Sequence, residues 1–152
     1  MALNTDQIKE LREKTGAGVM DVKNALESTE GDMVKAEEWL KQKGLASAAK
    51  KSERETKQGL IEAYIHNGRI GAMIEVNCET DFVARTEDFK KLCHEIALQV
   101  ASMNPQNVQE LMEQEFIKET STSIEQLVKG VIAKVGENIV IARFQRYELG
   151  SN

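Results

Sequence analysis

The sequence predicts an α+β protein: an N-terminal bundle of three helices, followed by a small core with a three-stranded antiparallel sheet packed by helices. Two observations lead to this fold class. Caps and glycine stops divide the first 44 residues into three short amphipathic segments. Beyond residue 58, apolar residues alternate on both sides of Asn67-Gly68, which is a strong hairpin signal. We therefore expect a three-helix domain at 1–45, a charged helical linker at 46–58 and an α+β core at 59–152.

The helices of the first domain are marked at their ends. Asn4 is a candidate N-cap, and Gln7 stands three residues later, where it would complete a capping box. Gly16 is expected to end the first helix, and Gly44 the third. The helices are predicted over residues 5–15, 19–28 and 33–43, with inward-facing residues Ile8, Leu11, Val22, Ala25, Leu26, Met33, Ala36 and Leu40. A bundle this small is typical of a docking module and leaves little room for a catalytic cavity.

The core domain begins with two predicted strands, at residues 59–66 and 70–78, and its last element, at 139–149, is a third. Helices are expected at 87–103 and 124–135, and a further short one is allowed near 108–112. Because these helices cover only one face of a three-stranded sheet, the other face needs a partner or heavy polar cover. The predicted helix boundaries are Thr86, Asn104-Pro105, Ser123 with Gln126, and Gly136.

Composition argues against several functional classes. The chain has 152 residues and a net charge of −5, with acidic and basic residues interspersed, unlike a dedicated nucleic-acid binder. Two cysteines, Cys78 and Cys93, are too few for a secreted disulfide framework. No apolar run approaches the length of a bilayer span, and the start lacks the pattern of a signal peptide. We expect a cytoplasmic protein that binds neither nucleic acid directly nor a membrane.

Catalytic and metal-binding patterns are weak. Cys93-His94 together with Cys78 and His66 matches no zinc spacing, and Cys93 falls on the buried stripe of its predicted helix. The glycines at 16 and 18 lack the preceding strand and the full spacing of a phosphate-binding loop. With histidine only at positions 66 and 94, no Ser–His–Asp arrangement is indicated. We expect no enzyme active site, no cofactor and no metal.

An aromatic side chain stands where small polar residues are usual. Residues 77–86 join the second predicted strand to a helix, and Phe82 lies beside Asp81 in this junction. Such junctions are normally rich in small and polar residues. Phe82 is therefore either the lid of a local core or a side chain offered to another molecule, and the pattern alone leaves both interpretations open.

A second candidate contact surface lies in the first domain. Val19 and Met20 follow the glycine turn at the exposed start of the second helix, and Arg12 is near the end of the first. A soft apolar pair beside a guanidinium makes a reasonable protein-contact patch. The alternative is that Met20 caps the small core of the bundle.

Four segments are similar to the elongation factor Ts family, which catalyses nucleotide exchange on elongation factor Tu during translation. They are residues 11–23 (LREKTGAGVMDVK), 48–51 (AAKK), 74–85 (IEVNCETDFVAR) and 134–139 (KVGENI), and the resemblance extends from about residue 3 to residue 149. It implies a UBA-like N-terminal bundle and a small α+β core. It also implies that the chain is not an enzyme but an exchange factor, which binds elongation factor Tu·GDP and promotes GDP release by perturbing the Mg²⁺ and phosphate site.

The resemblance further implies which residues contact elongation factor Tu. In the family, the N-terminal bundle docks on the GTPase domain of Tu, and the resemblance implies that the C-terminal domains of Tu also take part in the contact. The aromatic of the family's Thr-Asp-Phe motif inserts between helices of the GTPase domain. The matching positions, and hence the expected partner-binding residues, are Arg12, Val19, Met20, Thr80, Asp81, Phe82 and Val83.

The chain departs from the family pattern in two places. Val19 stands where the family usually has methionine, so the apolar contact is kept without the flexible thioether. Only about 20 residues, 105–124, separate the two predicted core helices, whereas longer family members carry more chain there. Short members with a single core module pair their sheets, so the resemblance implies a homodimer.

A rival class is a UBA-like protein-binding adaptor without exchange activity. Such an adaptor would need only the N-terminal bundle to bind its partner, whereas exchange also requires Phe82 in the core. A third class, a thiol or metal enzyme, would require Cys78 or Cys93 to be reactive or bound to a metal.

Overall fold

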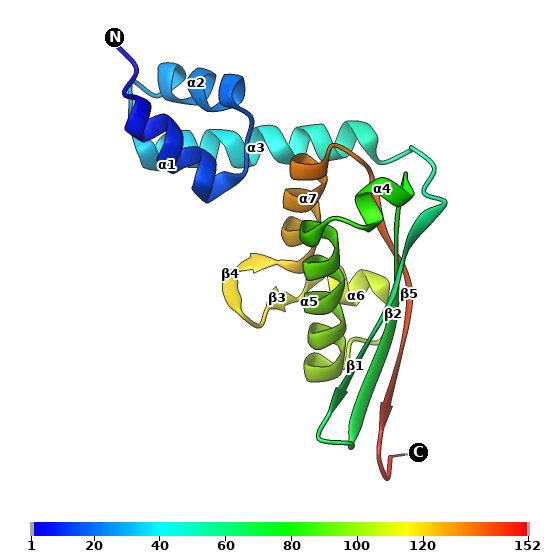
Figure 1. Cartoon of the computed structure of the whole chain (residues 1–152). Helices are drawn as coiled ribbons and strands as arrows, with labels where there is room; N and C mark the ends of the chain where they lie inside the picture. The colour runs from blue at the N-terminus through cyan, green and yellow to red at the C-terminus, as the bar shows by residue number, and fades with distance from the viewer. Residues whose placement is uncertain (1, 152) are drawn as a thin grey trace. The chain divides into compact units, whose positions relative to one another are not determined.

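The structure, a computed structural model, describes residues 2–151 and confirms the α+β class (Figure 1). The chain divides into two compact units, residues 1–50 and 51–152. The first unit is made of helices, and the second contains the antiparallel sheet with further helices.

The first unit is a bundle of three helices, α1 (Thr5–Thr15), α2 (Val19–Ser28) and α3 (Met33–Lys51). Asn4 caps α1 as predicted, because its side chain accepts a hydrogen bond from the Asp6 amide at 2.9 Å. The expected capping box is wrong, since the Gln7 amide donates instead to the Gly31 carbonyl at 3.2 Å. Gly16 ends α1 in the left-handed conformation. The buried core of the unit consists of Leu11, Val22, Ala25, Leu26, Ala36 and Leu40.

The third helix is longer than the sequence predicts. The expected stop at Gly44 is wrong, because Gly44 does not take a positive φ and α3 continues to Lys51. A glycine inside a helix costs only about 1 kcal/mol relative to alanine, and the alanine-rich stretch 46–49 favours continuation. Residues 46–51 of the expected linker therefore belong to this helix.

The second unit is built on three antiparallel strands, β1 (Gln58–His66), β2 (Ile70–Cys78) and β5 (Ile139–Glu148), in the order β1-β2-β5. Asn67 and Gly68, with φ of 52° and 65°, form the predicted tight turn between the first two. Along β2, buried Ile74 and Val76 alternate with exposed Met73, so one face of the strand is turned to the core.

Two helices lie on one face of this sheet, α5 (Glu87–Met103) and α7 (Ile124–Val135) (Figure 1). Thr86 caps α5 and the helix ends at Asn104, both as predicted, and Asn104 takes the left-handed conformation. The capping box of Ser123 and Gln126 opens α7, also as predicted. The largest fully buried apolar side chains of this unit are Ile74, Val76, Phe89, Leu92, Ile96, Val100, Leu111 and Ile124.

The remaining elements are short: α4 (Asp81–Ala84), α6 (Val108–Glu113), β3 (Glu115–Phe116) and β4 (Glu119–Ser123). Only α6 matches the sequence prediction. The small β3–β4 ribbon depends on Gln99, a fully buried side chain of α5. Its amide nitrogen donates to Gln114 Oε1 at 3.1 Å and to the Glu115 carbonyl at 3.0 Å, while its oxygen accepts from the Ile117 amide at 3.0 Å.

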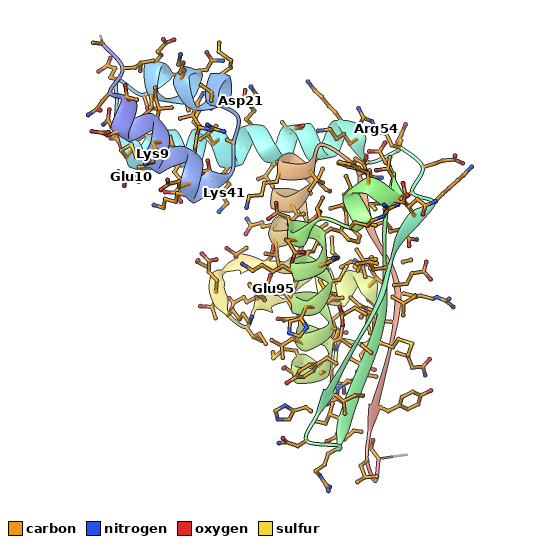
Figure 2. All side chains as sticks on the ribbon, viewed as in Figure 1. Lys9, Glu10, Asp21, Lys41, Arg54 and Glu95 are labelled. Atoms are coloured by element: carbon orange, nitrogen blue, oxygen red, sulfur yellow. The ribbon has the colours of Figure 1, made fainter. Side chains whose placement is uncertain are left out.

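The other face of the sheet is uncovered within the described residues, as expected. Figure 2 shows side chains projecting from the sheet on the side away from α5. Glu75 and Arg143 form an ion pair there, with Nε and Oε1 2.9 Å apart. By strand register, the exposed large apolar residues of this face are Ile61, Ile65, Met73, Val140 and Tyr147. This set is defined here as the open sheet face.

Candidate functional site

The junction after β2 forms one helical turn that presents an aromatic side chain. Thr80 is the N-cap of α4, and its hydroxyl accepts a hydrogen bond from the Val83 amide at 3.3 Å. Phe82 is 78% exposed, whereas Val83 and Ala84 are 6% and 5% exposed. The buried pair anchors the turn to the core, so Phe82 points away from it. Of the two interpretations left open by the sequence, the structure favours the side chain offered to another molecule.

Asp81, the neighbour of Phe82, is also held in place. Its Oδ2 pairs with Nη2 of Arg85, one helical turn later. Both side chains are exposed, so the pair is worth little to stability. Its effect is to keep a carboxylate and a guanidinium together at the surface beside the aromatic ring.

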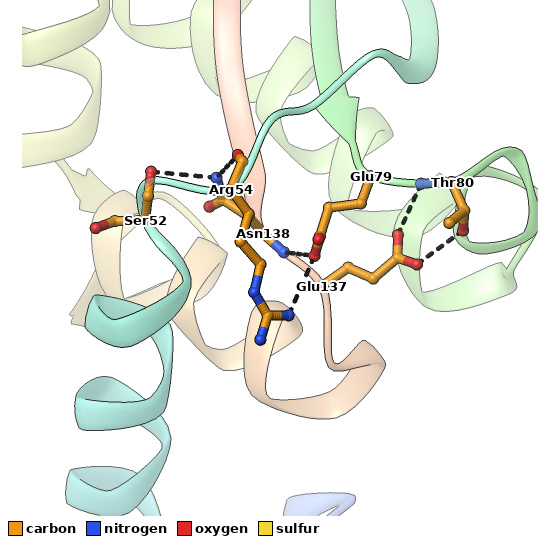
Figure 3. Close-up of polar contacts among 6 residues, drawn as sticks. All are labelled: Ser52, Arg54, Glu79, Thr80, Glu137 and Asn138. Atoms are coloured by element: carbon orange, nitrogen blue, oxygen red, sulfur yellow. Dashed lines mark hydrogen bonds and ion pairs between the residues drawn. The ribbon is translucent and has the colours of Figure 1, made fainter.

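A set of polar contacts fixes the base of the junction, and Figure 3 shows these contacts. Thr80 donates twice to the Glu137 carboxylate, from its amide at 3.0 Å and from its hydroxyl at 2.8 Å. In the opposite direction, the Asn138 amide donates to Glu79 Oε2 at 2.7 Å. Arg54 lies 3.6 Å from the same Glu79 oxygen. The turn after β2 therefore donates to a carboxylate of the turn after α7, and the turn after α7 donates to a carboxylate of the turn after β2.

Sequence reasoning missed Glu137 and Asn138 as site residues. They belong to the segment 134–139, which is quoted above only for its family resemblance. A signal was present: two polar side chains stand between Gly136, the C-cap of α7, and the first residue of β5. Polar residues squeezed between a helix stop and a strand often serve neighbouring backbone groups.

The patch predicted in the first unit is exposed. Met20 is 66% exposed and Val19 is 39% exposed, so Met20 does not cap the bundle core. Both lie in the first turn of α2, where Gly18 is the N-cap and supplies no side-chain hydrogen bond. Arg12, in the last turn of α1, borders a shallow groove, whose lining residues are Thr5, Ile8, Lys9, Arg12, Glu13, Gly16 and Ala17.

The cysteines are placed for packing rather than for reaction. Cys78 and Cys93 are free thiols and both are fully buried. Burial raises the pKa of Cys93 to about 12, and it also raises the pKa of Cys78. Because the thiolate is the reactive form, both thiols are poor nucleophiles at neutral pH. Among residues 2–151, no three potential ligands lie together as metal ligands do.

Comparisons with known proteins decide the family. The model of the family "Elongation factor TS" matches residues 79–152. The Elongation factor Ts of Herpetosiphon aurantiacus is 44% identical to this chain, with all of both chains covered. The chain belongs to the elongation factor Ts family. Further members with this name are those of Synechococcus sp. (strain JA-3-3Ab), 46% identical over 99% of this chain and 70% of the relative, and of Thermotoga neapolitana, 43% identical over 99% and 98%.

The match to the elongation factor Ts family includes the junction that presents Phe82. The family model begins at Glu79 and so includes Phe82 and the turn with Glu137. The alignment with the Herpetosiphon relative is 198 positions long, 46 more than the 152 residues of this chain. This chain is therefore shorter than the Herpetosiphon relative. In the part of the chain that the structure describes, no helix is both long and apolar enough to span a membrane.

Proposed function

We propose that this chain binds the GDP-bound form of elongation factor Tu and accelerates GDP release, so that GTP can replace it. The observation that carries the proposal is the exposure of Phe82 on a turn anchored by Val83 and tied to Glu137. The Phe82 side chain is 78% exposed, while the backbone turn that carries it is fixed by neighbouring residues. Such an aromatic side chain is suited to packing into a pocket on a partner's surface.

The physical basis is differential binding to two states of the GTPase. A GTPase holds GDP through backbone amides around the phosphates and through Mg²⁺. A side chain that fits only when the helices beside this site are displaced stabilises the arrangement that binds GDP weakly. The coupling is reciprocal: the factor weakens GDP binding, and GDP weakens factor binding, by the same ratio. Each 1.4 kcal/mol of differential binding changes nucleotide affinity about tenfold.

The remaining expected contacts take different roles in this proposal. Arg12, Val19 and Met20 of the first unit dock on the GTPase domain of elongation factor Tu, and their exposure supports this role. Asp81, already paired with Arg85, holds the register of the contact by hydrogen bonding. Val83 contributes by anchoring the turn, because its own side chain is buried. The C-terminal domains of Tu complete the proposed interface.

The test is release of a fluorescent GDP analogue from the cognate elongation factor Tu, followed by stopped flow with increasing amounts of this chain. We expect the release rate to rise with concentration and to level off, at least about tenfold above the spontaneous rate. A chain that binds Tu without changing GDP release would instead be an adaptor. A chain that does neither contradicts the proposal.

A homodimer is proposed from the open sheet face. This face presents several large apolar side chains to solvent, and exposed apolar residues gathered on one face are typical of a protein–protein contact. Two copies related by a two-fold axis would cover it with the same residues from each copy, and the Glu75–Arg143 pair would lie within the contact.

Light scattering coupled to size-exclusion chromatography tests the dimer. At micromolar concentration the chain should elute at about twice its 17.0 kDa mass. Met73→Glu, which places a charge in the open sheet face, should give the monomer mass. Met103→Glu is the matched control, because Met103 is 50% exposed, close to the 56% of Met73, but lies at the end of α5, and it should leave the dimer intact. A 17.0 kDa species for the unaltered chain contradicts this proposal.

A further inference from the structure

The turn that presents Phe82 is too short to hold itself. α4 has four residues, and a single turn of helix is unfavourable without outside contacts. Thr80 supplies two acceptors to the turn: its hydroxyl accepts from the Val83 amide at 3.3 Å, and its carbonyl accepts from the Ala84 amide at 3.3 Å. The position of Thr80 therefore acts together with the buried Val83 and Ala84 to fix the turn and the direction of Phe82.

Glu137 determines that orientation. The hydroxyl of Thr80 accepts a hydrogen bond from the Val83 amide and at the same time donates one to the Glu137 carboxylate at 2.8 Å. The second oxygen of the same carboxylate accepts the Thr80 amide at 3.0 Å. Two bonds from one carboxylate to one residue fix both the backbone and the rotamer of Thr80. Hydrogen bonds to a charged acceptor are the stronger kind.

The turn that carries Glu137 is itself fixed. Asn138 is only 3% exposed, and its side-chain amide donates to the carbonyls of Ser52 at 3.3 Å and Arg54 at 2.9 Å (Figure 3). Its backbone amide donates to Glu79, the residue just before Thr80. Glu137 therefore acts from a rigid support, and it is not a surface carboxylate that happens to lie near the junction.

We propose that Glu137 is a positioning residue for nucleotide exchange: through Thr80 it holds the turn that presents Phe82 in its binding conformation before the partner arrives. This inference rests on the proposed function, and it adds Glu137, which is not among the expected partner-binding residues and is bonded to one of them, Thr80. When only a fraction of the free protein is in the competent conformation, the apparent affinity falls by that fraction. The rate at saturation depends on contacts made in the complex, and these remain.

The experiment compares Glu137→Ala with the unaltered chain in the same GDP-release assay. We expect the concentration needed for half-maximal stimulation to rise roughly tenfold, while the rate at saturation stays within about twofold. Glu137→Gln keeps the side-chain length and one acceptor oxygen, so its effect should be intermediate. Glu125→Ala, which removes another exposed carboxylate at the start of α7, is the control and should behave as the unaltered chain.

A second readout needs no partner. In Glu137→Ala the amide of Thr80 should exchange its hydrogen with solvent several-fold faster, measured by NMR, while the amides of α5 keep their protection. Faster exchange at Thr80 together with the shifted half-maximal concentration supports the inference. An unchanged half-maximal concentration, or the same shift in Glu125→Ala, overturns it. If the unaltered chain itself fails to stimulate GDP release, the proposed function fails and this inference fails with it.

Discussion

Replacing Phe82 by alanine should lower the maximal rate of stimulated GDP release by roughly thirtyfold or more, because a buried aromatic at the centre of an interface is typically worth 2 kcal/mol or more. Stability should hardly change, since a side chain that is 78% exposed contributes little to the fold. The release assay is run at saturating factor, and thermal unfolding is followed by circular dichroism on the same samples.

The control for Phe82→Ala is Val34→Ala. Val34 is 77% exposed, so this change also removes an apolar surface side chain, but it lies in α3 of the first unit. It should leave both the maximal rate and the unfolding temperature unchanged. Full stimulation by the Phe82→Ala chain would refute the role of Phe82 in displacing the partner's helices.

Replacing Phe89 by alanine should lower the stability of the fold and leave GDP release close to normal, the reverse of the result expected for Phe82→Ala. Phe89 lies seven residues after Phe82 but is fully buried in α5 against the sheet. Truncating a core phenylalanine costs about 3–5 kcal/mol, through lost apolar burial and the cavity that remains. For a unit of this size the unfolding midpoint should fall by roughly 12 °C or more. Differential scanning calorimetry measures the shift.

Phe89→Leu is the matched change, because it keeps most of the volume and should lose much less stability. At a temperature where the Phe89→Ala chain is still folded, its GDP-release activity should be close to normal. A midpoint within about 2 °C of the unaltered chain would show that the site collapses around the missing ring.

Much of the fold could be predicted because its signals are local. The caps at Asn4, Thr86 and Ser123 each satisfy a nearby backbone amide, and the turn at Asn67-Gly68 needs only its own positive φ angles. Where the outcome depends on distant groups, the sequence was insufficient. The β3–β4 ribbon is polar and has weak patterning, and it is ordered by Gln99 from another helix.

The candidate site divides in the same way. Phe82 could be found from sequence because a large aromatic in a strand–helix junction is unusual in itself. The sequence could not show whether the Phe82 side chain is buried or exposed to a partner, because that depends on Val83 and Ala84 taking the inward positions. Glu137 acts on Thr80 across 57 positions of sequence, and no local pattern at either residue reveals the other. Gly44 does not end its helix as predicted, because glycine permits the left-handed conformation without requiring it.

The bonds between Thr80 and Glu137 also close a loop of chain. Everything from α4 to the end of α7 is an excursion whose two ends are pinned together, 57 residues apart. The entropic cost of lengthening a closed loop grows only with the logarithm of its length. If all 46 additional alignment positions of the Herpetosiphon relative fell within this excursion, its length would not quite double, which costs roughly 0.6 kcal/mol or less. An insertion of that size between Thr80 and Glu137 would therefore leave the bonds that tie the junction nearly as favourable as they are in this chain.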